Sequence, residues 1–310
     1  RARGLLSAER EWTMDCGKGV RLLGHYSPQV GDSAGLAVLL HGWEGSSYSN
    51  YILSTGAHLF DQGFDVFRLN FRDHGDTHHM NPGVFHSCRL DEVIGGLADM
   101  QERTGADHWG IAGFSLGGNF ALRVALEGPG AGLSVSRSVA ICPVLNPDHV
   151  LKKMEDGPTF YENYYNQRWA RSLKKKQACF PDRYDYQEWF DLPDMRERTR
   201  YLAIRYYGFR TLKDYFEGYS VADGRLAPLA VPSSILTSVD DPVIPVSDID
   251  SLPDNPYIEI DITKHGGHCG YLKNWKLESW AEEYISDRLL NRVPRYVPQE
   301  PLQDLDEQRA

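Results

Sequence analysis

The sequence predicts an α/β protein in which a mostly parallel central sheet is flanked by helices. From residue 36 to about residue 143, short apolar runs of strand length alternate with longer segments whose apolar residues recur at helical spacing. Such alternation is typical of a parallel sheet with helices on both faces. The run at residues 36–40 is apolar at every position, which favours a strand covered on both faces.

The expected elements follow one another in a simple order. Residues 11–30 carry short extended patterns broken by glycine and proline, and predict an opening hairpin or edge strands. Further strands are expected in the apolar run that begins at residue 109 and at residues 36–40, 65–70, 138–143, 233–238 and 257–262. Helices, indicated by apolar residues that fall on one face, are expected at residues 49–60, 87–104, 116–126 and 274–290.

One long segment breaks this alternation. From residue 146 to residue 229 the chain is rich in Tyr, Trp and Phe, mixed with Lys and Arg, and shows no strand pattern. We expect this segment (146–229) to form a helical lid, or cap, inserted into a core made of residues 1–145 and 230–293. Residues 294–310 hold prolines and acidic residues, which predict an extended or disordered tail.

Composition narrows the class of protein. The chain has 310 residues, of which 41% are hydrophobic, and a net charge of −10 with no basic block. Nucleic acid is therefore not an expected partner. No apolar run approaches the roughly 18 residues that span a bilayer, and the opening residues are too short an apolar stretch for a signal peptide. The five cysteines are scattered without a C-x-x-C motif, which favours a reduced compartment. We expect a cytoplasmic protein.

The stretch at residues 109–126 contains the motif that points to chemistry. Gly113-Phe-Ser-Leu-Gly117 matches G-x-S-x-G and lies between a predicted strand and a predicted helix, which is the context in which a strained turn presents a nucleophilic serine. Gly113 and Gly117 lie where such a turn presses the backbone against its neighbours, so side chains there would clash. We therefore predict Ser115 as the nucleophile. The alternative is a glycine-rich turn without a chemical role.

A serine hydroxyl needs a base, and the base needs an acid that orients it. In this topology the acid and then the histidine follow the serine, each after a later strand. Asp241 follows the strand expected at residues 233–238, and His268 follows the one at residues 257–262. Both would lie at the same edge of the sheet as Ser115.

Each of these two roles has a second candidate nearby. Asp240 precedes Asp241, but an aspartate beside this turn is commonly a cap, so Asp241 is preferred. His265 precedes the Gly-Gly-His-x-Gly segment, whose small residues leave space for the His268 imidazole. We interpret His265 as a surface or loop histidine.

When a serine attacks a carbonyl group, the negative charge that develops on the carbonyl oxygen requires preorganised N–H donors. One is expected to be the backbone N–H of Leu116, the residue after the nucleophile, and the other the N–H of Trp43 in the first strand-to-helix loop. His41, at the start of that loop, either braces it by hydrogen bonding or is simply a buried histidine with satisfied hydrogen bonds. Trp43 could line an acyl pocket or only pack.

No metal site is predicted. Four histidines lie on or near a polar loop without the fixed spacing of metal ligands, namely His74, His78, His79 and His86. Cys269 follows His268 directly, yet the strand-to-helix turn carries serine rather than cysteine, so no thiol nucleophile is expected.

Several motifs together resemble the α/β-hydrolase fold superfamily, and most closely its YheT-like branch, which is related to embryogenesis-associated and abhydrolase-domain esterases. The resemblance extends from about residue 36 to residue 290 and rests on residues 41–45, 51, 113–119, 215–220, 240–243 and 266–271. It implies a hydrolase of carboxylic esters without a cofactor and the triad Ser115, Asp241 and His268. The chain departs from the family pattern at Asp73, where relatives usually carry glycine after the arginine that corresponds to Arg72.

The sequence therefore predicts a serine hydrolase, most simply a carboxylesterase with a small-molecule ester substrate. A lipase or a thioesterase would use the same triad, with the aromatic lid covering a longer acyl chain. An α/β-hydrolase fold that binds a ligand without catalysis is the alternative from another class. The sequence does not indicate the oligomeric state.

Overall fold

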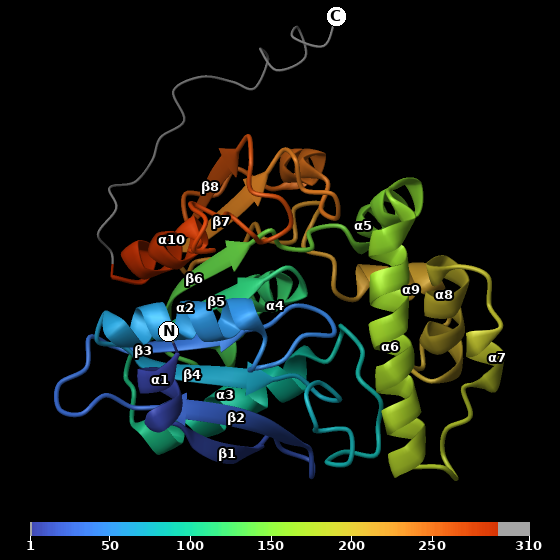
Figure 1. The fold of residues 1–310 in the computed structure, drawn as a ribbon, viewed down its shortest axis with the longest axis horizontal. Helices are drawn as coiled ribbons and strands as arrows, with labels where there is room; N and C mark the ends of the chain where they lie inside the picture. The colour runs from blue at the N-terminus through green and yellow to red at the C-terminus, as the bar shows by residue number, and fades with distance from the viewer. Residues whose placement is uncertain (1, 291–310) are drawn as a thin grey trace, which may run out of the picture.

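The structure is a computed structural model that describes residues 2–290. Its centre is an eight-stranded sheet with the order β1-β2-β4-β3-β5-β6-β7-β8 (Figure 1). The pairs β1–β2 and β2–β4 are antiparallel, and every other neighbouring pair is parallel. The predicted α/β class with a mostly parallel sheet is confirmed, as is the opening hairpin.

Three strands of the sheet are buried along their whole length. The strands of the sheet are β1 (Arg10–Asp15), β2 (Arg21–Ser27), β3 (Leu36–Leu40), β4 (Asp65–Asn70), β5 (Trp109–Phe114), β6 (Val135–Ile141), β7 (Ser233–Ser238) and β8 (Ile258–Thr263). Every residue of β3, β5 and β7 is buried, because helices cover both faces of the sheet at these central positions. The continuous apolar run at residues 36–40 is the sequence signal of this arrangement.

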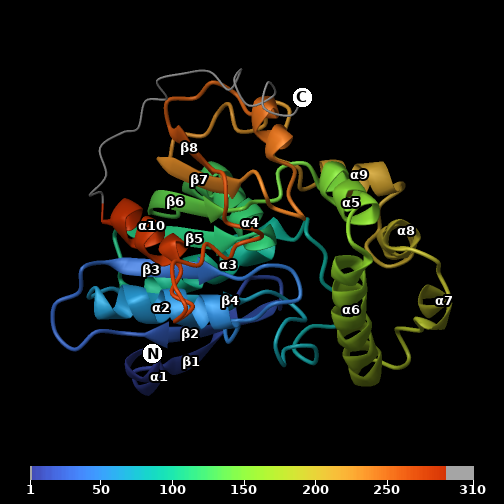
Figure 2. The same cartoon turned by 45° about the horizontal axis from the view of Figure 1, so that its top comes forward.

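Helices pack on both faces of the sheet (Figure 2). One face carries α1 (Arg3–Ser7), α2 (Asn50–Asp61) and α10 (Trp280–Leu289), and the other carries α3 (Leu90–Thr104) and α4 (Leu116–Glu127). Helix α3 ends at Gly105, whose φ of 65° suits a left-handed C-terminal cap. The layers leave the carboxyl ends of the parallel strands free to carry loops.

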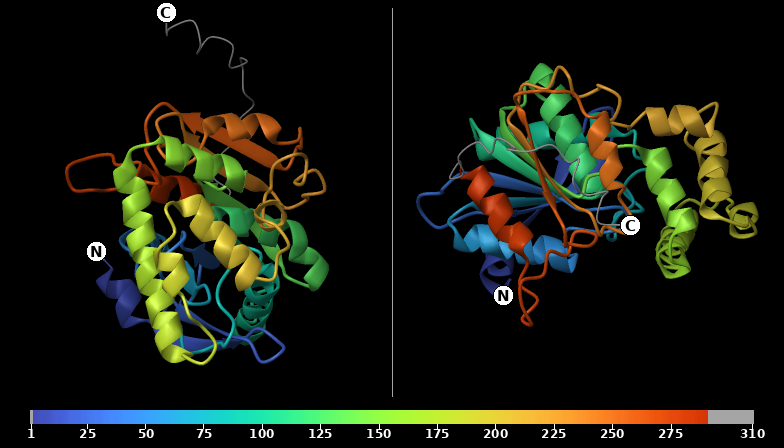
Figure 3. Two further views of the ribbon diagram at one scale, coloured as in Figure 1. Left: turned by 90° about the vertical axis from the view of Figure 1, so that its right-hand side faces the viewer. Right: turned by 90° about the horizontal axis from the view of Figure 1, so that it is seen from above.

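Between β6 and β7 the chain forms five helices, and this group stands to one side of the sheet (Figure 3). They are α5 (Pro147–Asp156), α6 (Thr159–Cys179), α7 (Gln187–Phe190), α8 (Met195–Arg205) and α9 (Leu212–Glu217). We call this group the lid. The segment 147–217 is fully described and contains no strand. The division of the chain at residues 145, 230 and 293 stays a prediction, and the expected tail at 294–310 lies outside the described residues.

The expected start of the last helix is wrong. A helix was expected at residues 274–290, but α10 begins at Trp280. The preceding residues form a tight turn in which the Lys273 N–H donates to the Glu278 carbonyl at 2.8 Å. Ser279 then caps the helix, because its side chain accepts a hydrogen bond from the Ala281 N–H. Local capping therefore overrides the apolar spacing upstream.

Candidate active site

Ser115 lies on the sharp turn between β5 and α4. Its φ of 53° and ψ of −117° are unfavourable for a residue with a side chain. The flanking glycines make this turn possible. A Cβ atom on Gly113 would lie 2.0 Å from the Gly117 carbonyl oxygen, and one on Gly117 would lie 2.3 Å from the Leu40 carbonyl oxygen. The steric reason for expecting glycine at both positions is therefore present in the structure.

Ser115, His268 and Asp241 form one chain of hydrogen bonds. His268 Nε2 lies 3.1 Å from Ser115 Oγ, and His268 Nδ1 lies 3.0 Å from Asp241 Oδ2. Asp241 is 1% exposed, and its Oδ1 also accepts hydrogen bonds from the backbone N–H groups of Val243 and Ile244. A carboxylate only accepts, so Nδ1 carries the imidazole proton and Nε2 is left to accept from the serine hydroxyl.

The two alternative candidates pair with each other instead. Asp240 Oδ1 accepts hydrogen bonds from the Gly266 and Gly267 N–H groups, both at 2.9 Å. The Gly267 amide is the main reason why the pKa of the Asp240 carboxyl is below its usual range. His265 Nδ1 lies 3.4 Å from Asp240 Oδ2, and its side chain is 88% exposed. These residues hold the loop that carries His268, and neither touches Ser115.

His41 is buried and fully hydrogen-bonded. Its Nδ1–H donates to the Gly42 carbonyl at 2.8 Å, and its Nε2 accepts from the Phe71 N–H at 3.2 Å. Burial holds the pKa of this imidazole well below its usual range, so it stays neutral and serves as both donor and acceptor. The two interpretations of His41 therefore coincide, because a buried histidine with satisfied hydrogen bonds is what ties the first loop to the residues after β4.

A second histidine, His74, braces the same loop and was not assigned a role from the sequence. Its Nδ1–H donates to the Arg72 carbonyl at 2.8 Å, and its Nε2 accepts from the Glu44 N–H at 3.1 Å. Burial lowers the pKa of His74 to about 4. The available signal was its position after β4, at the edge of the sheet to which the first loop also belongs.

This bracing leaves the Trp43 amide without a partner. The Gly42 N–H donates to Tyr51 Oη at 2.9 Å and the Glu44 N–H to His74, whereas no acceptor for the Trp43 N–H is found within residues 2–290. Leu116 is the first residue of α4, where backbone N–H groups have no intrahelical acceptor. One predicted donor thus lies in the first loop, and the other lies at the start of α4, directly after Ser115.

An apolar cavity of about 110 Å³ opens beside Ser115 between the core and the lid. Trp43 lines it and stacks on Tyr165 of α6, with ring centroids 5.5 Å apart. The aromatic residues of the lid therefore fall into two groups, those that line the cavity and those that do not. Those that line the cavity are Tyr165, Trp169, Tyr207, Tyr215, Phe216 and Tyr219, whereas Tyr184, Tyr186 and Trp189 are buried elsewhere in the lid.

Comparison with known proteins places the chain in a family. Residues 37–252, well over half of the chain, match the family model described as alpha/beta hydrolase fold. The chain belongs to the α/β-hydrolase fold family. The resemblance to the α/β-hydrolase fold superfamily that we inferred from the motifs is thereby confirmed.

The relatives of this α/β hydrolase include proteins named as esterases. It is 28% identical over 263 residues to "Putative esterase YheT" of Escherichia coli K12, covering 81% of this chain and 75% of that protein. It is 23% identical to "Putative esterase slr0264" of a Synechocystis strain, over 92% of this chain and 83% of that one. Among solved structures, an esterase of Pyrococcus furiosus, Pf2001, has a TM-score of 0.60 at 15% identity, with 92% and 90% of the two chains covered. This last likeness concerns the fold alone.

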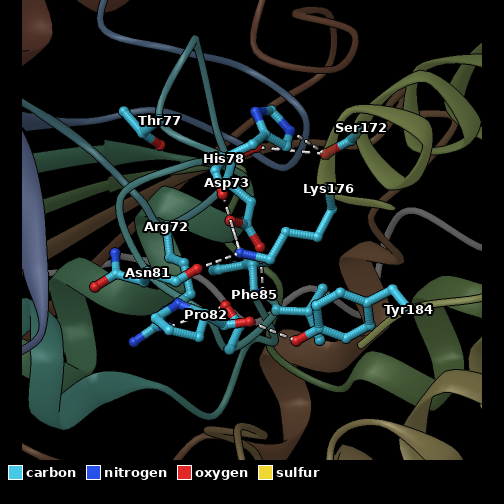
Figure 4. Close-up of polar contacts among 12 residues, drawn as sticks. Arg72, Asp73, Thr77, His78, Asn81, Pro82, Phe85, Ser172, Lys176 and Tyr184 are labelled. Atoms are coloured by element: carbon cyan, nitrogen blue, oxygen red, sulfur yellow. Dashed lines mark hydrogen bonds and ion pairs between the residues drawn. The ribbon is translucent and has the colours of Figure 1, made fainter. Parts of the chain in front are cut away.

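Asp73, where the resemblance to the family implies glycine, contacts the lid (Figure 4). Asp73 has a φ of 60°, a left-handed conformation that favours glycine. Its Oδ1 binds Lys176 Nζ of α6 at 2.7 Å, and its Oδ2 accepts from the Phe85 N–H at 2.8 Å. Lys176 is fully buried and donates further hydrogen bonds to the carbonyls of His78 and Asn81. The side chain at position 73 therefore connects the lid to the loop beside the site.

The loop histidines of this α/β hydrolase do not gather as metal ligands. Within residues 2–290, none of His74, His78, His79 and His86 belongs to a group of three or more potential metal-ligating side chains. His78 Nε2 instead lies 2.9 Å from Ser172 Oγ of α6 (Figure 4). The group that does occur in the described chain is Cys142, His268 and Cys269. The sequence analysis missed this group because Cys142, which follows β6, is far in the sequence from His268 and Cys269.

Among the helices within residues 2–290, none combines the length and the apolar character that a membrane-crossing helix needs.

Proposed function

We propose that this α/β hydrolase is a serine carboxylesterase. The observation that carries the proposal is the hydrogen-bonded chain from Ser115 Oγ through His268 to Asp241, at a strained turn beside an apolar cavity. Hydrolysis of esters as the broader activity agrees with relatives that are named as esterases.

The reaction follows from the tautomer that Asp241 imposes. His268 Nε2 removes the hydroxyl proton as Ser115 Oγ attacks the ester carbonyl, and then donates that proton to the leaving alcohol. Asp241 stabilises the imidazolium that forms between these steps. The carbonyl oxygen becomes an oxyanion, and the N–H groups of Trp43 and Leu116 are the proposed donors to it. Water, activated by the same imidazole, hydrolyses the acyl-enzyme.

The size of the cavity favours short acyl groups. An apolar cavity of about 150 Å³ holds benzene, so the cavity of about 110 Å³ beside Ser115 accommodates an acyl chain of about four carbons. Another relative is named for a different class of ester, "Phospholipase ABHD3" of Homo sapiens, which is 24% identical over 78% of this chain and 60% of that protein. We attribute this proposed limit to the aromatic side chains of the lid that line the cavity.

A series of p-nitrophenyl esters tests both the activity and the chain length. We expect kcat/KM to be highest for the acetate to butyrate esters and to fall by at least about tenfold for the decanoate, because longer chains do not fit the cavity. Ser115→Ala should hydrolyse none of them above background. A maximum at decanoate or beyond would favour a lipase, a matched thioester hydrolysed faster would favour a thioesterase, and no turnover by folded protein would favour a ligand-binding role.

A further inference from the structure

Three potential metal ligands meet directly beside the proposed nucleophile. Cys142 follows β6, and His268 and Cys269 lie on the loop after β8. One ligand atom from each residue lies within 4.8 Å of the ligand atoms of the other two. We propose that Cys142, Cys269 and His268 form an inhibitory binding site for a thiophilic divalent cation of the Zn²⁺ or Cd²⁺ type. The cation site stands on this cluster alone, whereas its inhibitory effect rests on the proposed esterase function.

The donor set and its dimensions fit such a cation. Two thiolates and one imidazole are ligands that select Zn²⁺ and related soft cations over Mg²⁺ or Ca²⁺. With Zn–S bonds of about 2.3 Å and Zn–N bonds of about 2.0 Å, the donors of a tetrahedral site lie about 3.5–3.8 Å apart. The present separations of up to 4.8 Å therefore close with side-chain shifts of about 1 Å.

Each thiol has polar contacts that a cation would replace. Cys269 Sγ contacts the Ile141 carbonyl at 3.7 Å, and Cys142 Sγ contacts the Gly267 carbonyl at 3.8 Å; both are long contacts of a weak donor. Cys142 Sγ also lies 3.3 Å from Tyr271 Oη, and this is the contact that cation binding must displace. Cys142 is buried, while Cys269 and His268 are only partly buried, so part of the cluster is accessible to solvent.

Asp241 supplies the carboxylate that commonly supports a metal-bound histidine. His268 Nδ1–H is held by Asp241 at 3.0 Å, so Nε2, which faces Ser115 Oγ at 3.1 Å, carries the lone pair that we assign to the cation. A carboxylate that fixes the far nitrogen of a metal-bound imidazole is the usual support of such ligands, because it orients the ring and raises its basicity. The orientation that prepares His268 as a base therefore also prepares it as a ligand.

Cation binding and catalysis exclude each other in this arrangement. Nε2 is the atom that lies 3.1 Å from Ser115 Oγ and that must accept the serine proton. Its single lone pair serves either the proton or the cation. A bound cation thus removes the base from Ser115 while leaving the turn and the cavity in place.

Titration with Cd²⁺ tests the site without relying on activity, because thiolate–Cd²⁺ charge transfer absorbs in the ultraviolet. The full chain, reduced and then freed of reductant under nitrogen, should bind one Cd²⁺ with such a band. Cys142→Ala and Cys269→Ala should each weaken binding by at least about 100-fold, since loss of a ligand costs at least as much as loss of an outer-shell partner. The matched control is Cys179→Ala, which removes an exposed cysteine and should leave the band unchanged.

Inhibition is then measured on the same samples with the p-nitrophenyl butyrate assay, each variant relative to its own metal-free rate. Cd²⁺ and Zn²⁺ should inhibit the wild-type chain at the concentration that saturates the band, and EDTA should restore the rate. Ser115→Ala should keep the band, so failure of the esterase proposal would leave the cation site intact. Absence of a band, a band that survives both cysteine changes, or a saturated band without inhibition of an active enzyme would overturn the proposal.

Discussion

Replacing Asp241 by asparagine is expected to lower kcat/KM by about 10⁴-fold, which corresponds to roughly 5.5 kcal/mol of transition-state stabilisation. The fold should persist, because an asparagine oxygen can still accept the Val243 and Ile244 N–H groups that Asp241 Oδ1 accepts now. The amide nitrogen would then face His268 Nδ1 as a donor. The imidazole proton would move to Nε2, which could no longer accept the proton of Ser115.

The neighbouring aspartate provides the control for this prediction. In Asp240→Asn the amide oxygen can still accept from Gly266 and Gly267, so kcat/KM should stay within about threefold of the wild-type value, as for an exposed group with no contact to the reacting atoms. Both variants are measured with p-nitrophenyl butyrate, and circular dichroism checks their folding. The opposite ranking, with Asp240→Asn inactive and Asp241→Asn active, would show that the acid has been misassigned.

Replacing Lys176 by methionine is expected to lower the free energy of unfolding by about 3–5 kcal/mol, because it leaves the buried Asp73 carboxylate without its charge partner. Lys176 Nζ also donates to the His78 and Asn81 carbonyls, which would lose a hydrogen bond within a buried network. Urea denaturation followed by circular dichroism at pH 7 measures the change.

Lys175 offers a matched comparison one residue earlier on α6. It pairs with Asp76 at 3.0 Å, but the side chains are 55% and 97% exposed. An exposed pair of this kind contributes about 0–1 kcal/mol, so Lys175→Met should shift stability by no more than that. Equal losses in the two variants would contradict the view that burial makes the Lys176–Asp73 pair a stronger link between lid and core than the exposed pair.

The sequence was most informative where a single local pattern determines the structure. The apolar run at 36–40 predicted β3 because a strand buried on both faces has no polar positions. Gly113 and Gly117 predicted the turn at Ser115 because the backbone approach there excludes a side chain. Chain order then placed Asp241 and His268, since both follow strands that end at the same edge of the sheet.

Contacts between distant segments were not predictable in this way. Lys176 appeared as one of several lysines in a helical segment, and only the packing of α6 against the loop after β4 shows that it is buried beside Asp73. Cys142 likewise gains significance only when β6 and the loop after β8 meet. The start of α10 was misplaced because a capping serine and a tight turn outweighed apolar spacing. Side-chain partners across elements depend on tertiary packing, which composition and periodicity do not encode locally.

Labelling with a fluorophosphonate, followed by peptide mass mapping, tests the central claim most directly. The reagent forms a stable adduct with a serine whose hydroxyl is activated by a neighbouring base. The wild-type chain should carry one adduct, on the peptide that contains Ser115, and Ser115→Ala should carry none. An adduct on another residue, or labelling of Ser115→Ala to the wild-type extent, would contradict the assignment of Ser115 as the nucleophile.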